Sequence, residues 1–340
     1  MTTAAAARRA FWTGKRVLVT GCSGFVGRWL TRELVEQGAT AVGLVRDTVP
    51  EFERMLDGPL SELTVVRGEV EDLGFVERTL NDYRIDTCIH LAAQSLVGTA
   101  NRSPTGTFET NIAGTWNVLE AARRLETGIR VVMASSDKAY GDPEALPLTE
   151  AMPLQGRHPY DVSKSCADLI AQVYARHYRL PVAIMRCGNI YGEGDVNFNR
   201  IVPETMRALL RDEPPPIRSD GTFIRDYLHV ADAASAYLTV AERLNEPGVT
   251  GEAFNFSAER PVSVLELVQL MIRISGKTHL QPLILRTATG EIREQYLSCA
   301  KARAVLGWSP QVTLEDGLAR AYHWYADKFR CAEFIQQHAK

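Results

Sequence analysis

Short apolar runs alternate along roughly the first 190 residues with longer segments in which apolar side chains recur every three or four positions. The apolar runs predict buried strands at residues 16–20, 41–45, 63–66, 87–91, 131–134 and 182–186. The periodic segments predict helices at residues 28–37, 71–80, 107–125 and 163–178. Because this alternation forms a parallel sheet with helices on both faces, we expect an α/β fold with a doubly wound, Rossmann-type sheet.

The rhythm of strands and helices changes after about residue 190, and Glu-Pro-Pro-Pro at residues 213–216 interrupts the chain. A later segment again reads as a strand followed by a helix, which indicates a return to the large sheet. We therefore expect a Rossmann-type domain and a smaller C-terminal α/β lobe that binds substrate. The expected division assigns residues 12–190 and 226–258 to the domain, and residues 191–225 and 259–330 to the lobe.

The composition excludes several classes of function. The chain of 340 residues carries 38 Lys and Arg against 41 Asp and Glu, so its formal charge of −3 would not recruit nucleic acid or an anionic membrane. No apolar run approaches the roughly 18 residues of a transmembrane helix, and the first residues lack the apolar core of a signal peptide. The cysteines show no metal-ligand spacing, so no metal is expected. A cytoplasmic globular protein is the expectation.

A glycine-rich turn lies between the first predicted strand and the first predicted helix, in the sequence Gly21-Cys22-Ser23-Gly24-Phe25-Val26-Gly27. Glycines allow a tight turn and let the backbone approach a pyrophosphate at the start of a helix. In this position the turn predicts a dinucleotide cofactor. The candidate contacts are the turn residues Gly21, Ser23, Gly24, Phe25, Val26 and Gly27, and the strand-end residues Glu69, Val70, Leu91, Ala92 and Ala93.

The end of the second predicted strand offers two opposite signals for the cofactor. An acidic residue there binds the ribose 2′-hydroxyl of NAD, whereas an arginine accommodates the 2′-phosphate of NADP. This chain has both, Arg46 and Asp47, side by side. A solvated loop pair is the alternative interpretation, and Glu69 has the same alternative.

Tyr160 and Lys164 form a YxxxK pair, and the spacing of four places both side chains on one helical face. Tyrosine is a poor base at neutral pH unless a nearby cation stabilises its phenolate, which Lys164 would do. Lys164 would also hold the ribose of a nicotinamide cofactor. Ser136 ends the fifth predicted strand between the glycine turn and this pair, so the three residues together predict an oxidoreductive active site.

With these motifs the chain resembles the extended short-chain dehydrogenase/reductase family, whose members mostly act on nucleotide sugars. The resemblance runs from about residue 12 to residue 325. It implies NAD, because Asp47 falls where the family tends to have an acid, with NADP left open. It also implies a homodimer through the helices at residues 107–125 and 163–178. The motifs that carry it are Thr20–Gly27, His90–Ala93, Asn111–Thr115, Tyr160 with Lys164, Arg225–Val230 and Lys301–Trp308.

Within that family, an acid and a base directly after Ser136 look like the sugar-nucleotide 4,6-dehydratase branch, and most like CDP-glucose 4,6-dehydratase. In 4-epimerases this stretch carries no such pair. Asp137 and Lys138 therefore favour an NDP-glucose 4,6-dehydratase, a lyase, with CDP-glucose the favoured substrate. A surface ion pair, a UDP-sugar type 4-epimerase and a non-catalytic NAD(P)-sensing protein are the alternatives.

The resemblance implies a role for each catalytic candidate. Tyr160 takes the proton of the 4-hydroxyl while Ser136 hydrogen-bonds the same oxygen, and a hydride leaves C4 for the cofactor. The 4-ketone acidifies the C5 proton, which Lys138 removes once burial and the charge of Lys164 favour its neutral form. Asp137, protonated, donates to the departing 6-hydroxyl, and the hydride returns to C6.

The sequence also offers candidate contacts to the substrate. By resemblance, Asn189 and Arg225 lie near the sugar diphosphate, which a guanidinium binds by two parallel hydrogen bonds. Arg200, Arg293 and Gln94 are further candidates. The alternative is a solvated surface side chain for the two arginines and a plain loop amide for Gln94. The segment that begins Arg225-Asp226-Tyr227 has the form common in epimerases and in dTDP- or UDP-sugar enzymes, so it leaves the base of the substrate open.

Overall fold

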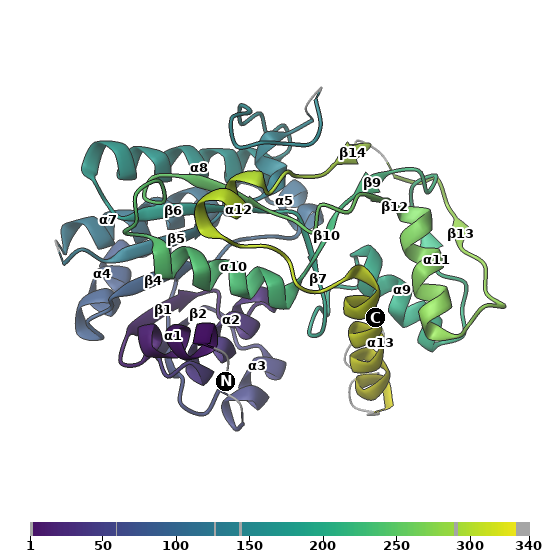
Figure 1. Ribbon diagram of the computed structural model, residues 1–340, viewed down its shortest axis with the longest axis horizontal. Coiled ribbons are helices and arrows are strands. Elements are labelled where there is room, and N and C mark those ends of the chain that lie inside the picture. Colours follow the sequence, from purple (N-terminus) through teal and green to yellow (C-terminus); the bar gives the residue numbers. More distant parts are fainter. Residues whose placement is uncertain (1–2, 59, 126, 143–144, 289–291, 331–340) are drawn as a thin grey trace.

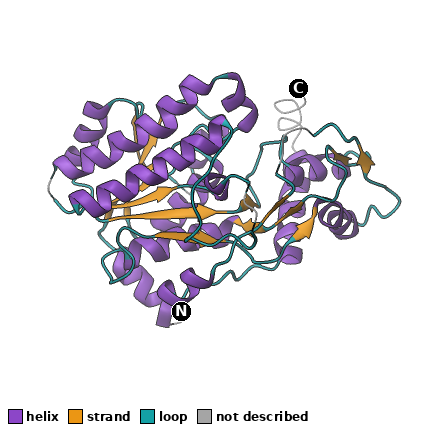
Figure 2. Ribbon diagram, turned by 90° about the horizontal axis from the view of Figure 1, so that it is seen from above, coloured by secondary structure: helices purple, strands orange, loops and turns teal. Residues whose placement is uncertain are grey.

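The computed structural model describes residues 3–330 except residues 59, 126, 143–144 and 289–291. A sheet of seven parallel strands runs through it in the order β11-β6-β5-β4-β1-β2-β3. Figure 2 shows these strands between two layers of helices, with a smaller lobe beyond one end of the sheet. The predicted doubly wound, Rossmann-type sheet is therefore confirmed. Its strands are β1 Arg16–Thr20, β2 Thr40–Val45, β3 Thr64–Arg67, β4 Thr87–His90, β5 Arg130–Ala134, β6 Val182–Cys187 and β11 Ala253–Phe256.

Alternate side chains of each strand bury against different helical layers, which is why the strands read as continuous apolar runs. In β1, Val17 and Val19 join the cluster that holds Leu30 and Leu34 of α2. Leu18 lies on the opposite face, in a cluster with helices α4, α7 and α8. One layer contains α1 Thr3–Trp12, α2 Phe25–Glu36, α3 Pro50–Leu56, α10 Val230–Arg243 and α12 Ala300–Leu306, and the other contains α4 Leu73–Asp82, α7 Gly114–Arg124 and α8 Pro159–Tyr178 (Figure 1).

The helix predicted over residues 107–125 is interrupted in the structure. It consists of α6 Pro104–Phe108, a widened π turn η1 Glu109–Ala113 and α7, preceded by α5 Val97–Arg102. Asn111 in the π turn is buried. Its side chain accepts a hydrogen bond from the main-chain amide of Gln94 at 2.7 Å and donates one to Ser163 Oγ at 2.9 Å. The wider turn thus directs one polar side chain toward the end of β4, a local effect that apolar periodicity does not register.

The smaller lobe has its own apolar core between three helices. Helix α11 begins with a capping box formed by Ser263 and Glu266 and ends at Gly276 in the left-handed conformation. Three small sheets complete the lobe, pairing β7 with β10, β9 with β12 and β14, and β8 with β13. The elements are β7 Asn189–Tyr191, α9 Ile201–Leu210, β8 Pro216–Ile217, β9 Ile224–Arg225, β10 Tyr227–His229, β12 Val262–Ser263, α11 Val264–Ser275, β13 Leu283–Ile284, β14 Glu294–Gln295 and α13 Leu314–Arg330.

A buried ion pair joins α8 to the large sheet. Arg186 of β6 donates through Nε and Nη2 to both carboxylate oxygens of Asp168, at 2.8 and 2.9 Å. Its Nη1 donates to the hydroxyl of Tyr140 at 2.8 Å, and that hydroxyl donates to Asn255 of β11 at 2.7 Å. Tyr140 ends η2 Asp137–Tyr140, a single 3-10 turn after β5. Helix α8 and the η2 turn are therefore fixed to neighbouring strands by one network.

The division of the chain at residues 190, 226 and 258 into a domain and a lobe stays a prediction. After the break at residues 213–216, strand β11 joins the large sheet beside β6, and helix α10 packs on the face of that sheet. Among the helices of the described residues, none has the length and apolar composition needed to cross a bilayer.

Candidate active site

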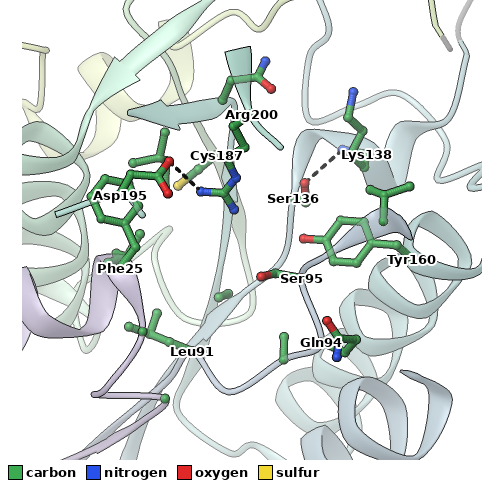
Figure 3. A pocket seen from close by; sticks show the side chains of 18 of the residues that line it. Phe25, Leu91, Gln94, Ser95, Ser136, Lys138, Tyr160, Cys187, Asp195 and Arg200 are labelled. Atoms are coloured by element: carbon green, nitrogen blue, oxygen red, sulfur yellow. Dashed lines mark hydrogen bonds and ion pairs between the residues drawn. The ribbon is translucent and has the colours of Figure 1, made fainter. Parts of the chain in front are cut away.

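A cavity of about 650 Å³ opens at the carboxyl ends of the large sheet's strands and extends to the smaller lobe. This is where a doubly wound sheet binds ligands, and the volume is typical of a small-molecule site. All five predicted catalytic residues line it, and Figure 3 shows several of them. Further predicted site residues on its wall are Gly21, Ser23, Gly24, Phe25, Val26, Gly27, Arg46, Asp47, Val70, Leu91, Ala92, Ala93, Gln94, Asn189, Arg200 and Arg225.

The glycine turn has the shape that a dinucleotide requires. Gly21 has φ +71°, and a Cβ there would lie 2.8 Å from the Ala92 amide nitrogen. A Cβ on Gly27 would lie 2.1 Å from the Gly21 carbonyl oxygen, so only glycine allows the turn to close on itself. Gly24 precedes α2 without a side-chain hydrogen bond to the helix start, which leaves that end suited to an anion. The residues present therefore fit a pyrophosphate.

Arg46 and Asp47 form an ion pair with each other at 2.7 Å beside this turn. Asp47 raises the pKa of the Arg46 guanidinium mainly through this hydrogen bond. The pairing partly neutralises the cation that a 2′-phosphate would need, while Asp47 keeps lone pairs for a ribose hydroxyl. Glu69 lies outside the main cavity, on a neighbouring hollow that it shares with Arg46, Glu71 and Gln94.

Ser136 caps the η2 turn from an extended backbone conformation. Its hydroxyl donates to Asp137 Oδ1 at 2.9 Å and accepts from the Lys138 amide at 3.2 Å. Asp137 is only 3% exposed, and its Oδ2 is buried without a hydrogen-bond partner among the described residues. An unpaired carboxylate oxygen on a cavity wall is a costly feature that a bound hydroxyl would satisfy.

Tyr160 and Lys164 come from the first two turns of α8, which begins with Pro159 at its first position. Burial raises the pKa of Tyr160 to about 12, against the opposing hydrogen bond of the Ser136 hydroxyl. Lys164 donates to the Ala134 carbonyl at 2.8 Å, and burial lowers the pKa of its amine to about 8. Figure 3 shows the Tyr160 hydroxyl directed toward the side of the cavity on which Ser136 lies.

The predicted substrate contacts differ in where the structure places them. Arg225 is 9% exposed and donates to the carbonyls of Ile224, at 2.8 Å, and Arg293, at 3.0 Å. Arg200 pairs with the buried Asp195 at 3.1 Å (Figure 3). Arg293 is exposed and does not line the cavity.

Asn189 and Gln94 on the cavity wall are both engaged within the protein. Asn189 donates to the Asp226 carbonyl at 3.3 Å. Gln94 uses its side-chain oxygen to accept from the Leu96 amide at 3.1 Å. Each side chain is thus held in place beside the cavity.

Sequence reasoning missed several side chains that the fold brings to this site. Gln295 is fully buried and contacts Lys138, although 157 residues separate them. Arg218 lines the lobe side of the cavity and pairs with Glu204 at 2.8 Å. Gln295, Arg218 and Glu204 belong to no sequence motif, so only the packing of the chain shows that they reach the cavity or its catalytic candidates. Within the described residues, no cluster of three or more His, Cys, Asp or Glu side chains is arranged to hold a metal.

Comparison with known proteins gives a consistent result. The sequence profile described as GDP-mannose 4,6 dehydratase matches residues 18–321. The CDP-glucose 4,6-dehydratase of Salmonella typhimurium is 32% identical over 93% of this chain and 91% of its own length.

Two solved structures are also similar. A UDP-glucose 4-epimerase from Thermotoga maritima, crystallised with UDP-glucose, has a TM-score of 0.84 at 27% identity and covers 92% of this chain and 99% of its own. A dTDP-glucose 4,6-dehydratase from Bacillus anthracis, in complex with NAD, has a TM-score of 0.82 at 26% identity and covers 94% and 98%.

The buried Lys164 amine predicts how the stability of the ligand-free protein depends on pH. Its pKa is lowered from 10.5 to about 8, so between these values the unfolded chain binds the proton that the folded chain has released. The free energy of unfolding should therefore rise with pH in that window, by about 3 kcal/mol for this group. Below that window, the buried ammonium of Lys164 destabilises the folded protein by the full amount. Urea unfolding of the wild type and Lys164→Met should show Met more stable near neutral pH, with the difference shrinking as pH rises. If the unfolding free energies of the two proteins change in parallel with pH, the pKa of Lys164 is not lowered by burial.

Proposed function

The chain belongs to the GDP-mannose 4,6 dehydratase family, and from this premise we propose that it is a NAD-dependent NDP-glucose 4,6-dehydratase. The observation that carries the proposal is the position of Asp137 and Lys138, directly after Ser136 and on the cavity wall that also holds Tyr160. An epimerase has no use for this additional acid and base. A dehydratase needs both, because it must remove a carbon-bound proton and expel a hydroxyl.

NAD is the proposed cofactor, and the fit of the glycine turn to a pyrophosphate supports it. The turn from Gly21 to Gly27 would hold the diphosphate, and Asp47 the ribose of the adenosine half. Lys164, on the wall of the same cavity, would hold the nicotinamide ribose. When bound, NAD supplies the hydride acceptor for C4 and the hydride donor for C6.

The protein's own groups then move the protons. Tyr160 accepts the proton of the 4-hydroxyl, and Ser136 holds that oxygen by a hydrogen bond. Lys138 removes the C5 proton, which the adjacent C4 ketone has made acidic, and forms an ammonium. The electron pair of the C5–H bond forms the C5–C6 double bond as the C6–O bond breaks. Asp137 acts as the general acid and gives a proton to the departing hydroxyl, so that water leaves.

CDP-glucose is the favoured substrate, and the Arg218–Glu204 pair supports this choice in addition to the Salmonella relative. Cytosine presents an amino donor at N4 beside acceptors at N3 and O2, whereas thymine and uracil present an acceptor at position 4. The guanidinium of Arg218 offers donors and the carboxylate of Glu204 offers an acceptor, side by side on the cavity wall. The Glu204 carboxylate could accept from the N4 amino group of cytosine while the Arg218 guanidinium donates to N3 or O2.

A substrate assay tests the function. Purified protein incubated with CDP-, dTDP-, UDP- or GDP-glucose should form a 4-keto-6-deoxy product, detected by its absorbance in alkali, fastest with CDP-glucose. Glu204→Gln should reduce the preference for CDP-glucose over dTDP-glucose by about tenfold, since one base contact contributes about 1–3 kcal/mol. A 4-epimer without keto sugar would overturn the dehydratase in favour of the epimerase, and no turnover of any sugar nucleotide would favour a non-catalytic NAD(P)-sensing protein.

The Lys138→Ala variant separates oxidation from elimination. Oxidation at C4 should persist, because Ser136, Tyr160 and Lys164 remain, while loss of the base should slow elimination by about 10²-fold or more. Reduced nicotinamide should therefore accumulate on the enzyme after mixing with substrate, which its absorbance reports. Lys15→Ala, outside the cavity, is the control. Normal dehydration by Lys138→Ala would show that another group is the base.

We also propose that the protein is a homodimer that pairs through helices α7 and α8. Large apolar side chains are exposed there, at 45% for Trp116, 52% for Leu169, 53% for Val173 and 49% for Tyr178. The two helices pack side by side, and exposed large apolar side chains on neighbouring helices are the kind of feature that marks an interface.

Sedimentation velocity tests this surface. Leu169→Glu combined with Val173→Glu should convert the dimer to a monomer, because two buried, unpaired carboxylates would cost several kcal/mol. Tyr83→Glu, an exposed aromatic position just beyond α4, should leave the dimer intact. A wild type that sediments as a monomer at micromolar concentration would contradict the proposal.

A further inference from the structure

Gln295 holds both members of the Asp137–Lys138 pair, although it belongs to the smaller lobe. Its side-chain amide donates from Nε2 to the Asp137 carbonyl oxygen at 3.0 Å. Its Oε1 accepts from Lys138 Nζ. Gln295 has no solvent exposure, whereas the Lys138 side chain is half-buried and lines the cavity. One amide thus fixes the main chain of the η2 turn and the position of the amine that the turn carries.

The strand that carries Gln295 is itself fixed at both ends. Strand β14 pairs in parallel with β9, and Gln295 lies opposite Arg225. The guanidinium of Arg225 donates to the carbonyls of Ile292 and Arg293, just before Gln295. Just after it, the Leu297 amide donates to the buried Asp226 carboxylate at 3.1 Å. The side chain of Gln295 therefore has a position determined by β9 and its neighbours.

A neutral amide suits this position better than the alternatives. A carboxylate would favour the charged form of the lysine and so reduce the fraction of free amine available as a base. An apolar side chain would leave the Asp137 carbonyl and the Lys138 amine without this partner. Glutamine can accept from the amine in either protonation state and still donate to the carbonyl.

We propose that Gln295 is a positioning residue that holds the amine of Lys138 for proton removal at C5 and links it, through β9, to the substrate contact at Arg225. The inference rests on the proposed function in so far as Lys138 is the base. Gln295 itself does not react. It acts by fixing the direction of Lys138 and by adding no negative charge of its own beside an amine that already interacts with the Asp161 carboxyl.

Two substitutions at this position distinguish placement from charge. Gln295→Leu should lower turnover by about 10²-fold with KM little changed, since misplacing a catalytic group by about 1 Å costs that much. Reduced nicotinamide should accumulate in this variant, because oxidation at C4 does not involve Gln295. Gln295→Glu should keep the contact but move the rising limb of the pH–rate profile to higher pH. Glu294→Gln changes the exposed neighbour of Gln295 in β14 and is the control. Its turnover and its pH–rate profile should match those of the wild type.

A measurement without substrate separates this inference from the proposed function. The reaction of Lys138 with acetic anhydride, followed by mass spectrometry against pH on the ligand-free protein, reports the neutral amine directly. The midpoint should move to higher pH in Gln295→Glu, and labelling should be faster in Gln295→Leu than in the wild type at equal pH. If wild type, Gln295→Glu and Gln295→Leu label identically, the inference is wrong whatever the substrate proves to be. If labelling shifts as expected but no sugar nucleotide is dehydrated, the contact stands and the proposed function fails.

Discussion

The buried ion pair between Arg186 and Asp168 is the interaction on which the candidate site depends. Both side chains are almost fully removed from water, at 3% and 0% exposed, and the guanidinium satisfies both carboxylate oxygens and the Tyr140 hydroxyl. Removing one partner of such a pair leaves an uncompensated buried charge, at a cost of about 3–5 kcal/mol. Loss of either partner would therefore loosen the contact between helix α8, the η2 turn and strand β6.

Those three elements carry the candidate catalytic groups. Asp168 lies on α8, which presents Tyr160 and Lys164 one turn apart. Tyr140 ends the η2 turn, which presents Asp137 and Lys138. Arg186 lies on β6, beside the strand from which Ser136 follows. Because the network joins α8 to the η2 turn, it helps to fix the position of Tyr160 relative to Lys138.

The smaller lobe completes the site through charge and hydrogen bonding. The whole chain has a formal charge of −3, yet the cavity wall carries Arg200, Arg218 and Arg225. Arg200 and Arg218 are paired there with Asp195 and Glu204. In the proposed function, a bound diphosphate would respond to these near groups more than to the distant charges that salt screens. Strand β14 adds Gln295, which contacts Lys138 and lies opposite Arg225 of the adjacent strand β9. In the proposed reaction, the small sheet that contains β9 and β14 would position both the diphosphate, through Arg225, and the base Lys138, through Gln295.

The sequence by itself determined the sheet, the glycine turn and the Tyr160–Lys164 pair, because each depends on local spacing: apolar runs, a strand-to-helix turn and one helical face. The same holds for Ser136, Asp137 and Lys138, which are adjacent in the chain. Only the tertiary structure decided that the helix over residues 107–125 opens into a π turn around Asn111, that Glu69 and Arg293 lie away from the main cavity, and that Gln295 reaches Lys138. These outcomes arise from contacts between segments 17 to 157 residues apart, whose packing no local periodicity records.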